Sequence, residues 1–119
     1  MSETKKAVIA FNYAEKIKSN LIITVGLLEV LDDMRDDEIA GAEKLLVAYL
    51  NAVIQEVTIA ANASGIQSFQ DINTKLDEAI KQLRQHDYAS VVKLVSEATS
   101  LSTTNGNRAA EALKEKGLI

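Results

Sequence analysis

Hydrophobic residues recur at alternating spacings of four and three along the first part of the chain, which is the pattern of one helical face. The residues that carry this stripe are Ala10, Ala14, Ile17, Leu21, Thr24, Leu28 and Leu31. They predict a helix from about Glu3 to Met34. The β-branched run at residues 21–25 is also typical of a buried strand. A helix is preferred because the stripe keeps its phase on both sides of this run.

An acidic segment from Asp32 to Asp37 separates this helix from a second hydrophobic stripe. The segment predicts a turn in which Asp36 or Asp37 starts the next helix, because a carboxylate accepts hydrogen bonds from free amides and suits the positive end of a helix. The second stripe consists of Ile39, Ala42, Leu46, Leu50, Val53, Val57 and Ala60. We expect this helix to end near Ala63, with Gly65 in the left-handed conformation that often follows a helix.

A third helix is predicted to start at Ser68, which forms a capping-box pattern with Asp71. Its apolar face consists of Phe69, Ile72, Leu76, Ala79, Ile80 and Leu83. The connection from Arg84 to Asp87 is short, and Asp87 is expected to cap a fourth helix. The apolar face of that helix consists of Tyr88, Val91, Val92, Val95, Ala98 and Leu101.

The hydrophobic pattern then fades through the polar segment at residues 102–107 and resumes at Ala109. Two interpretations remain open. The fourth helix continues through a polar section, or it breaks and a short fifth helix follows. Continuation is supported because the stripe resumes nearly in phase, and a break is supported by the poor helix propensity of the intervening residues.

These elements predict an all-α fold, an antiparallel up-and-down four-helix bundle with or without a short fifth C-terminal helix. The chain has 119 residues, a usual length for one domain, so residues 1–119 are expected to form a single helical domain. It contains no proline and only five glycines, which allows long uninterrupted helices.

The segment from Leu83 to Ala98 resembles the helical hairpin of tetratricopeptide repeats. The resemblance rests on Asp87 and Tyr88 at the turn, Val91 three residues later and Ala98 ten residues after the tyrosine. Such repeats recur at a period of about 34 residues, and the chain has no second copy. The sequence therefore predicts no repeat array, and no functional residue is transferred from that family.

Charge and composition exclude several classes of protein. The formal net charge is −4, which argues against nucleic-acid binding, because that needs a basic surface. The chain has no cysteine, so disulfides and thiolate metal sites are excluded. The most apolar run, residues 21–31, contains Glu29 and is shorter than the roughly 20 residues that span a bilayer. No signal-peptide pattern is found, and we expect a cytoplasmic protein without a membrane span.

The residues that carry chemistry do not form a known catalytic pattern. His86 is the one side chain of the type that usually changes charge near neutral pH, and it is interpreted as a surface residue of a turn. The Glu-x-x-His pattern of di-metal bundles does not occur. We therefore expect no cofactor and no metal, and favour a non-enzymatic protein. A small carboxylate-based enzyme or a ligand-binding bundle is the alternative.

The polar segment after Leu101 is the best candidate for binding an anion. If it forms a turn, its backbone amides are exposed and can bind an anion, with a nearby guanidinium adding charge. The residues of this candidate site are Thr104, Asn105, Gly106 and Arg108.

Self-association is predicted from the first two helices, because residues 21–31 and 45–54 are hydrophobic nearly all the way round. A helix at the edge of a bundle buries only one stripe, so wide apolar coverage indicates a second contact surface. The simplest such surface is a homodimer interface, and another protein is a further possible partner. The residues assigned to the interface are Leu21, Val25, Leu28, Leu46, Leu50 and Val53. The alternative is that both helices lie at the centre of the monomer's core.

Overall fold

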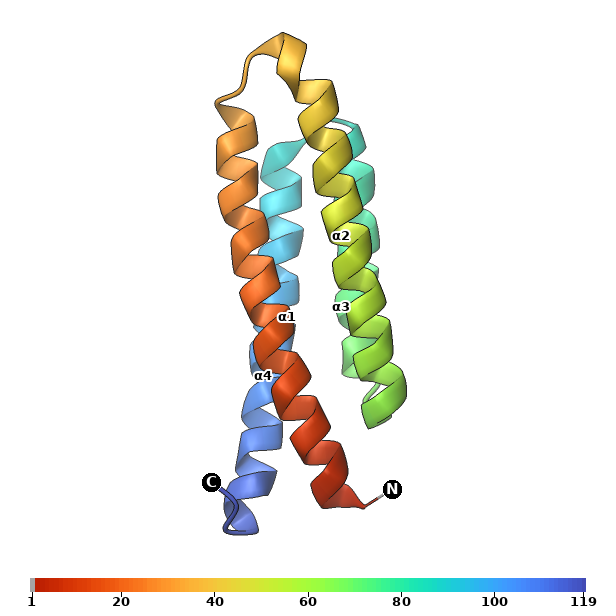
Figure 1. Cartoon of the computed structure of the whole chain (residues 1–119), viewed down its shortest axis with the longest axis vertical. Coiled ribbons are helices and arrows are strands. Elements are labelled where there is room, and N and C mark those ends of the chain that lie inside the picture. Colours follow the sequence, from red (N-terminus) through yellow and green to blue (C-terminus); the bar gives the residue numbers. More distant parts are fainter. Residues whose placement is uncertain (1) are drawn as a thin grey trace.

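The computed structural model describes residues 2–119 and forms four helices, which confirms the predicted all-α bundle (Figure 1). The helices are α1 (Glu3–Asp32), α2 (Asp36–Ser64), α3 (Ser68–Arg84) and α4 (Tyr88–Glu115). Short turns join them, so that successive helices run antiparallel. Residues 21–25 lie within α1, so the alternative of a strand at this position is wrong.

The helices form a closed ring in which α1 packs on α2 and α4, and α3 packs on the same two helices. The bundle measures 54 × 21 × 17 Å. Because α3 has only 17 residues while the others have 28 to 30, the full ring of four exists only in the middle. At one end the α1–α2 hairpin extends past the α3–α4 turn, and at the other end α1 and α4 extend past the α2–α3 turn (Figure 1).

Most of the predicted helix ends are confirmed. Gly65 adopts the left-handed conformation with φ of 71°. Asp87 caps α4 and accepts a hydrogen bond from the amide of Ser90 at 3.2 Å. At α2 the cap residue is Arg35, whose amide donates to the carboxylate of Glu38. The predicted cap at Asp36 or Asp37 is therefore wrong by one or two residues, and both carboxylates lie in the first turn of α2.

The predicted capping box at Ser68 is wrong. Ser68 is the first residue of α3, and Gln67 before it already has helical backbone angles without a side-chain cap. The Ser68 hydroxyl instead donates a hydrogen bond to Oδ1 of Asn105 on α4. A contact between helices has replaced the local one that the sequence pattern suggests.

Helix α4 is continuous through residues 102–107, so a short fifth helix does not form. Tertiary contacts offset the poor helix propensity of this segment. Ser102 is buried and its Oγ donates to the carbonyl oxygen of Ala14 at 2.8 Å. Gly106 lies against the same alanine, since a Cβ on Gly106 would be 3.3 Å from the Cβ of Ala14. The polar residues thus form a close contact between α4 and α1.

The core contains the predicted stripes except Val92 on α4, which is 37% exposed. It also contains most of the residues that are predicted to form a dimer interface. Leu21, Leu28, Leu46, Leu50 and Val53 are at most 5% exposed, and Val25 is partly buried against the core. These side chains pack within the monomer and are not available to a second chain while the bundle is intact. Any interface on these helices therefore has to use mainly other residues, although Leu46 also lines a surface groove.

Helix α2 is apolar on more than its buried side. Among residues 2–119 it is the one helix long and apolar enough to cross a membrane, judged by length and composition alone. The prediction that the chain has no membrane span rests only on the shorter apolar run in α1, residues 21–31. A helix in the core of a bundle can pass the same test, so this is weak evidence for a membrane. Only 33% of the most apolar 18-residue stretch of α2 is buried inside the bundle. Helix α2 therefore directs apolar side chains outward as well as inward.

Candidate functional site

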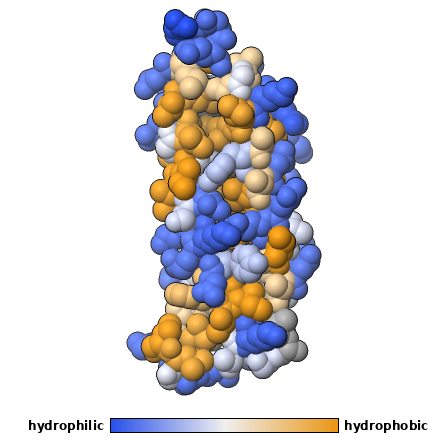
Figure 2. Space-filling view, viewed as in Figure 1, coloured by the Kyte–Doolittle hydropathy of each residue, from blue (hydrophilic) through white to orange (hydrophobic). Residues whose placement is uncertain are grey.

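An apolar groove lies between α1 and α2 near the turn that joins them. Three of its side chains are strongly exposed: Leu45 at 75%, Val30 at 55% and Leu27 at 41%. The groove has a volume of about 320 Å³, and its other lining residues are Leu31, Met34, Ala42, Leu46 and Tyr49. Figure 2 shows hydrophobic side chains gathered over this part of α1 and α2. Leu27, Val30 and Leu45 lie outside the buried positions of α1 and α2, so the bundle itself does not cover them.

Other exposed apolar side chains lie on the same two helices. Ile22 and Ile23 on α1 and Ile59 on α2 are each more than half exposed. Exposed apolar residues therefore do occur on the two helices of the predicted interface, but most of the residues named for that interface are buried. The exposed residues lie between the stripe positions, and the signal that could have identified them is the apolar run outside the stripe.

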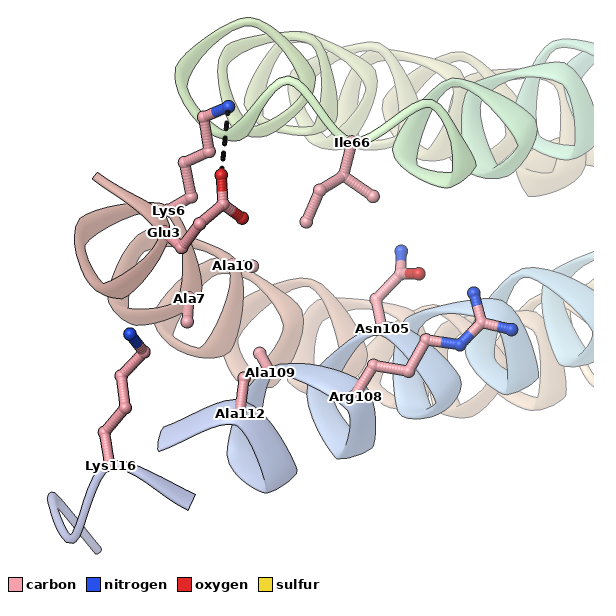
Figure 3. A pocket seen from close by; sticks show the side chains of 10 residues that line it. All are labelled: Glu3, Lys6, Ala7, Ala10, Ile66, Asn105, Arg108, Ala109, Ala112 and Lys116. Carbon is pink, nitrogen blue, oxygen red and sulfur yellow. Dashed lines mark ion pairs between the residues drawn. The ribbon is translucent and has the colours of Figure 1, made fainter. Parts of the chain in front are cut away.

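A second hollow lies at the opposite end, between the overhanging parts of α1 and α4 and the α2–α3 turn (Figure 3). Its volume is about 210 Å³. Ile66 closes it from the turn, and four alanines form the walls on α1 and α4: Ala7, Ala10, Ala109 and Ala112. The polar residues around it are Asn105, Glu3, Lys6, Arg108 and Lys116. We call this hollow the Asn105 cavity.

The predicted anion site is corrected by this geometry. Because residues 102–107 are helical, their backbone amides are within α4 and do not form an exposed anion-binding turn. Gly106 is buried against α1, and Thr104 is exposed outside the Asn105 cavity. Asn105 and Arg108 do line one cavity together. Two of the four candidates therefore share a site, through side chains and not through the backbone.

A hydrogen-bonded cluster ties the α3–α4 turn to α2. Nδ1 of His86 lies 2.7 Å from a carboxylate oxygen of Glu43, and the hydroxyl of Tyr88 donates to the same oxygen. Glu43 is 8% exposed, whereas the side chain of His86 is 67% exposed. His86 also has φ of 64°, an uncommon value for a residue with a side chain. The chain neighbour Asp87 takes no part, since its carboxylate caps α4.

This cluster combines a carboxylate, an imidazole and a phenol, but it does not form a nucleophile–base pair. Such a pair requires a serine, threonine or cysteine within hydrogen-bond reach of the imidazole. Among residues 2–119 the hydrogen bond of His86 goes to Glu43. Sequence reasoning missed Glu43 because it lies 43 positions from His86, and only the packing of α2 on the turn brings them together. The cluster is best explained as a tether that holds the turn.

The tether predicts a loss of stability at high pH. Burial, the hydrogen bond to Glu43 and the charge of Glu43 together raise the pKa of Tyr88 to about 12. Because the folded pKa lies above the unfolded value of about 10, the tether's stabilisation is complete below pH 10 and is lost as the pH rises through about 12. Urea unfolding followed at increasing alkaline pH should show this fall. Tyr88→Phe should make it shallower, and parallel curves for the two proteins would contradict the assignment.

Neither a metal site nor a known relative assigns a function to the described residues. No group of three or more His, Asp or Glu side chains in the part of the chain that the structure describes is arranged to hold a metal ion. Comparison of the chain with protein-family models, curated proteins and solved structures gives no match. The groove, the Asn105 cavity and the tether are therefore the features from which a function can be inferred.

Proposed function

We propose that this protein is a non-enzymatic helical module that forms a homodimer through the apolar groove of α1 and α2. The observation that carries the proposal is the exposure of Leu27, Val30 and Leu45 on two adjacent helices. Transfer of apolar surface from water contributes about 25 cal/mol per Å², so covering such a patch favours association. A contiguous exposed patch of this kind is typical of an interaction site.

A second copy fits the groove because the surface can be complementary to itself. In a twofold dimer the same patch serves both partners, so an exposed leucine such as Leu45 can enter the groove of the other chain. A stable interface buries about 800 Å² on each partner. The exposed isoleucines Ile22, Ile23 and Ile59 add apolar surface on the same two helices.

Charge restricts how two copies can meet. The α1–α2 turn carries five carboxylates and one guanidinium within a few residues: Asp32, Asp33, Asp36, Asp37, Glu38 and Arg35. Two such turns placed tip to tip would repel each other. An antiparallel arrangement of the two hairpins keeps the acidic turns apart while the apolar faces meet. The proposed dimer therefore has its twofold axis across the hairpins, away from the turns.

Sedimentation equilibrium or light scattering at micromolar concentration tests the proposal. The wild-type protein should have about twice the monomer mass of 12.9 kDa. Leu27→Glu should give a monomer, because a carboxylate buried without a partner opposes association by several kcal/mol. Val8→Glu is the matched control, because Val8 is on the same helix with almost the same exposure, 42% against 41%, but lies at the other end.

Three results would overturn the proposal. One is a wild-type mass of 12.9 kDa at all concentrations. The second is equal dissociation by Leu27→Glu and Val8→Glu, which would show that the groove is not the interface. The third is partition of the wild-type protein into lipid vesicles with loss of the dimer, which would assign the exposed face of α2 to a membrane. Circular dichroism should show that both variants remain helical.

A further inference from the structure

The Asn105 cavity contains a buried hydrogen-bond donor that the protein itself does not satisfy. The side chain of Asn105 is 3% exposed, and its Oδ1 accepts the hydrogen bond from Ser68. That bond leaves Nδ2 without a partner among the described residues. A buried donor without an acceptor is unfavourable, because it has lost its hydrogen bonds to water. An acceptor placed in the cavity would recover this free energy.

The amide of Asn105 points from α4 toward the α2–α3 turn and faces Ile66 across the cavity (Figure 3). Because Ser68 on α3 binds Oδ1, it orients the amide so that the nitrogen is the atom presented to the cavity. The walls to either side are the methyl groups of alanines, which contribute no polar atom beyond the backbone. The geometry is that of an apolar hollow with one fixed donor.

The charged residues around the cavity favour an anion. Lys6, Arg108 and Lys116 are opposed by one carboxylate, that of Glu3, which lies 3.9 Å from the ammonium group of Lys6. The lining therefore carries an excess of positive charge, although the whole chain has a net charge of −4. In Figure 3 the charged ends of these side chains lie around the edge of the cavity. Long, flexible side chains at such an edge can turn toward a bound anion.

The size of the cavity limits the ligand. Sites for drug-sized molecules have volumes of about 300–1,000 Å³, whereas this one has about 210 Å³. An apolar cavity of about 150 Å³ is enough to hold benzene. The remaining volume is enough for one carboxylate group. We propose that the Asn105 cavity binds a small monocarboxylate with an apolar body about as large as a benzene ring, with Nδ2 donating to the carboxylate.

Benzoate is a suitable probe, and the side-chain amide of Asn105 is the reporter. In a ¹⁵N-labelled sample, the two Nδ2 proton signals should move downfield on titration with millimolar benzoate, because they gain a charged acceptor. Benzyl alcohol has the same ring without the charge, and inorganic phosphate has charge without the ring. Both should shift these signals much less at the same concentration.

Two substitutions separate the donor from the surrounding charge. Asn105→Asp keeps an acceptor for Ser68 but replaces the donor by an oxygen, and should weaken benzoate binding by about tenfold or more. Arg108→Gln is on the exposed side of α4 and should weaken binding about threefold without disturbing the fold. Arg84→Gln is its matched control, because Arg84 is exposed at the far end of α3 and outside the cavity lining. It should leave binding unchanged.

The proposal can be tested even if Asn105→Asp fails to fold, because the comparison of Arg108→Gln with Arg84→Gln does not need that variant. No shift of the Asn105 amide signals with benzoate overturns it and leaves water as the partner of Nδ2. Equal shifts with benzyl alcohol would show an apolar hollow that does not recognise a carboxylate. Equal shifts with phosphate, or equal effects of Arg108→Gln and Arg84→Gln, would show a general response to ions. Either of these results would also overturn it.

Discussion

Leu50→Ala is expected to lower the free energy of unfolding by about 2–5 kcal/mol, the range measured for leucine truncation in protein cores. Leu50 is 0% exposed and lies at the centre of α2 within the main core cluster. Its removal loses apolar contacts and leaves a cavity that the surrounding helices can close only in part. Because small domains have total stabilities of about 5–15 kcal/mol, the variant should unfold at a much lower urea concentration.

Leu45→Ala is the matched control, since it makes the same chemical change five residues away on the same helix. Leu45 is 75% exposed, so its truncation should change the stability of the monomer by no more than about 0.5 kcal/mol. It should instead weaken self-association. Equal loss of stability in the two variants, measured by urea unfolding with an unchanged slope, would contradict the separation of core and surface on α2.

Gly106→Leu is expected to destabilise the bundle by about 2 kcal/mol through overpacking of α1 against α4. Even a methyl group at this position would lie 3.3 Å from the Cβ of Ala14 and 3.6 Å from a carboxylate oxygen of Glu15. A leucine requires α1 to move away, which would also stretch the hydrogen bond from Ser102 to the carbonyl of Ala14. Urea unfolding measures the loss.

Gly26→Leu controls for the general effect of replacing a helical glycine. A Cβ at Gly26 has no atom within 4 Å, so the change should raise stability by somewhat less than 1 kcal/mol through helix propensity. The two glycine variants should therefore differ in sign. A stabilised Gly106→Leu protein would show that the contact between α1 and α4 is looser than described.

Helix positions were predictable because each helix repeats its apolar residues with the same period over many turns. The left-handed Gly65 and the Asp87 cap were also predictable, because both follow from local chemistry. The capping box at Ser68 failed because the hydroxyl has a better-placed partner on α4. Local patterns thus predicted the helices, and the cap at Ser68 failed where a distant residue, Asn105, competed for the serine hydroxyl.

The candidate sites were less predictable because they depend on where the helices end relative to one another. The stripe residues Leu21 and Leu28 were assigned both to the core and to an interface, and one side chain cannot serve both. The exposed groove lies on parts of α1 and α2 that α3 and α4 do not cover, which shows only when the four helices are packed together. The link between Glu43 and His86, and the unsatisfied amide of Asn105, likewise arise from segments far apart in the sequence.

The ring of helices has a consequence for folding during synthesis. Every contact in the ring joins consecutive helices except that between α1 and α4, where residues as far apart as Ala14 and Ser102 meet. Long-range contacts of this kind form late because closing a long loop costs entropy first. On the ribosome, α1 is made first and has only α2 to cover its buried stripe until residues 88–115 have emerged. Until α4 emerges, the nascent chain therefore exposes an apolar face of α1 that α4 covers in the folded protein.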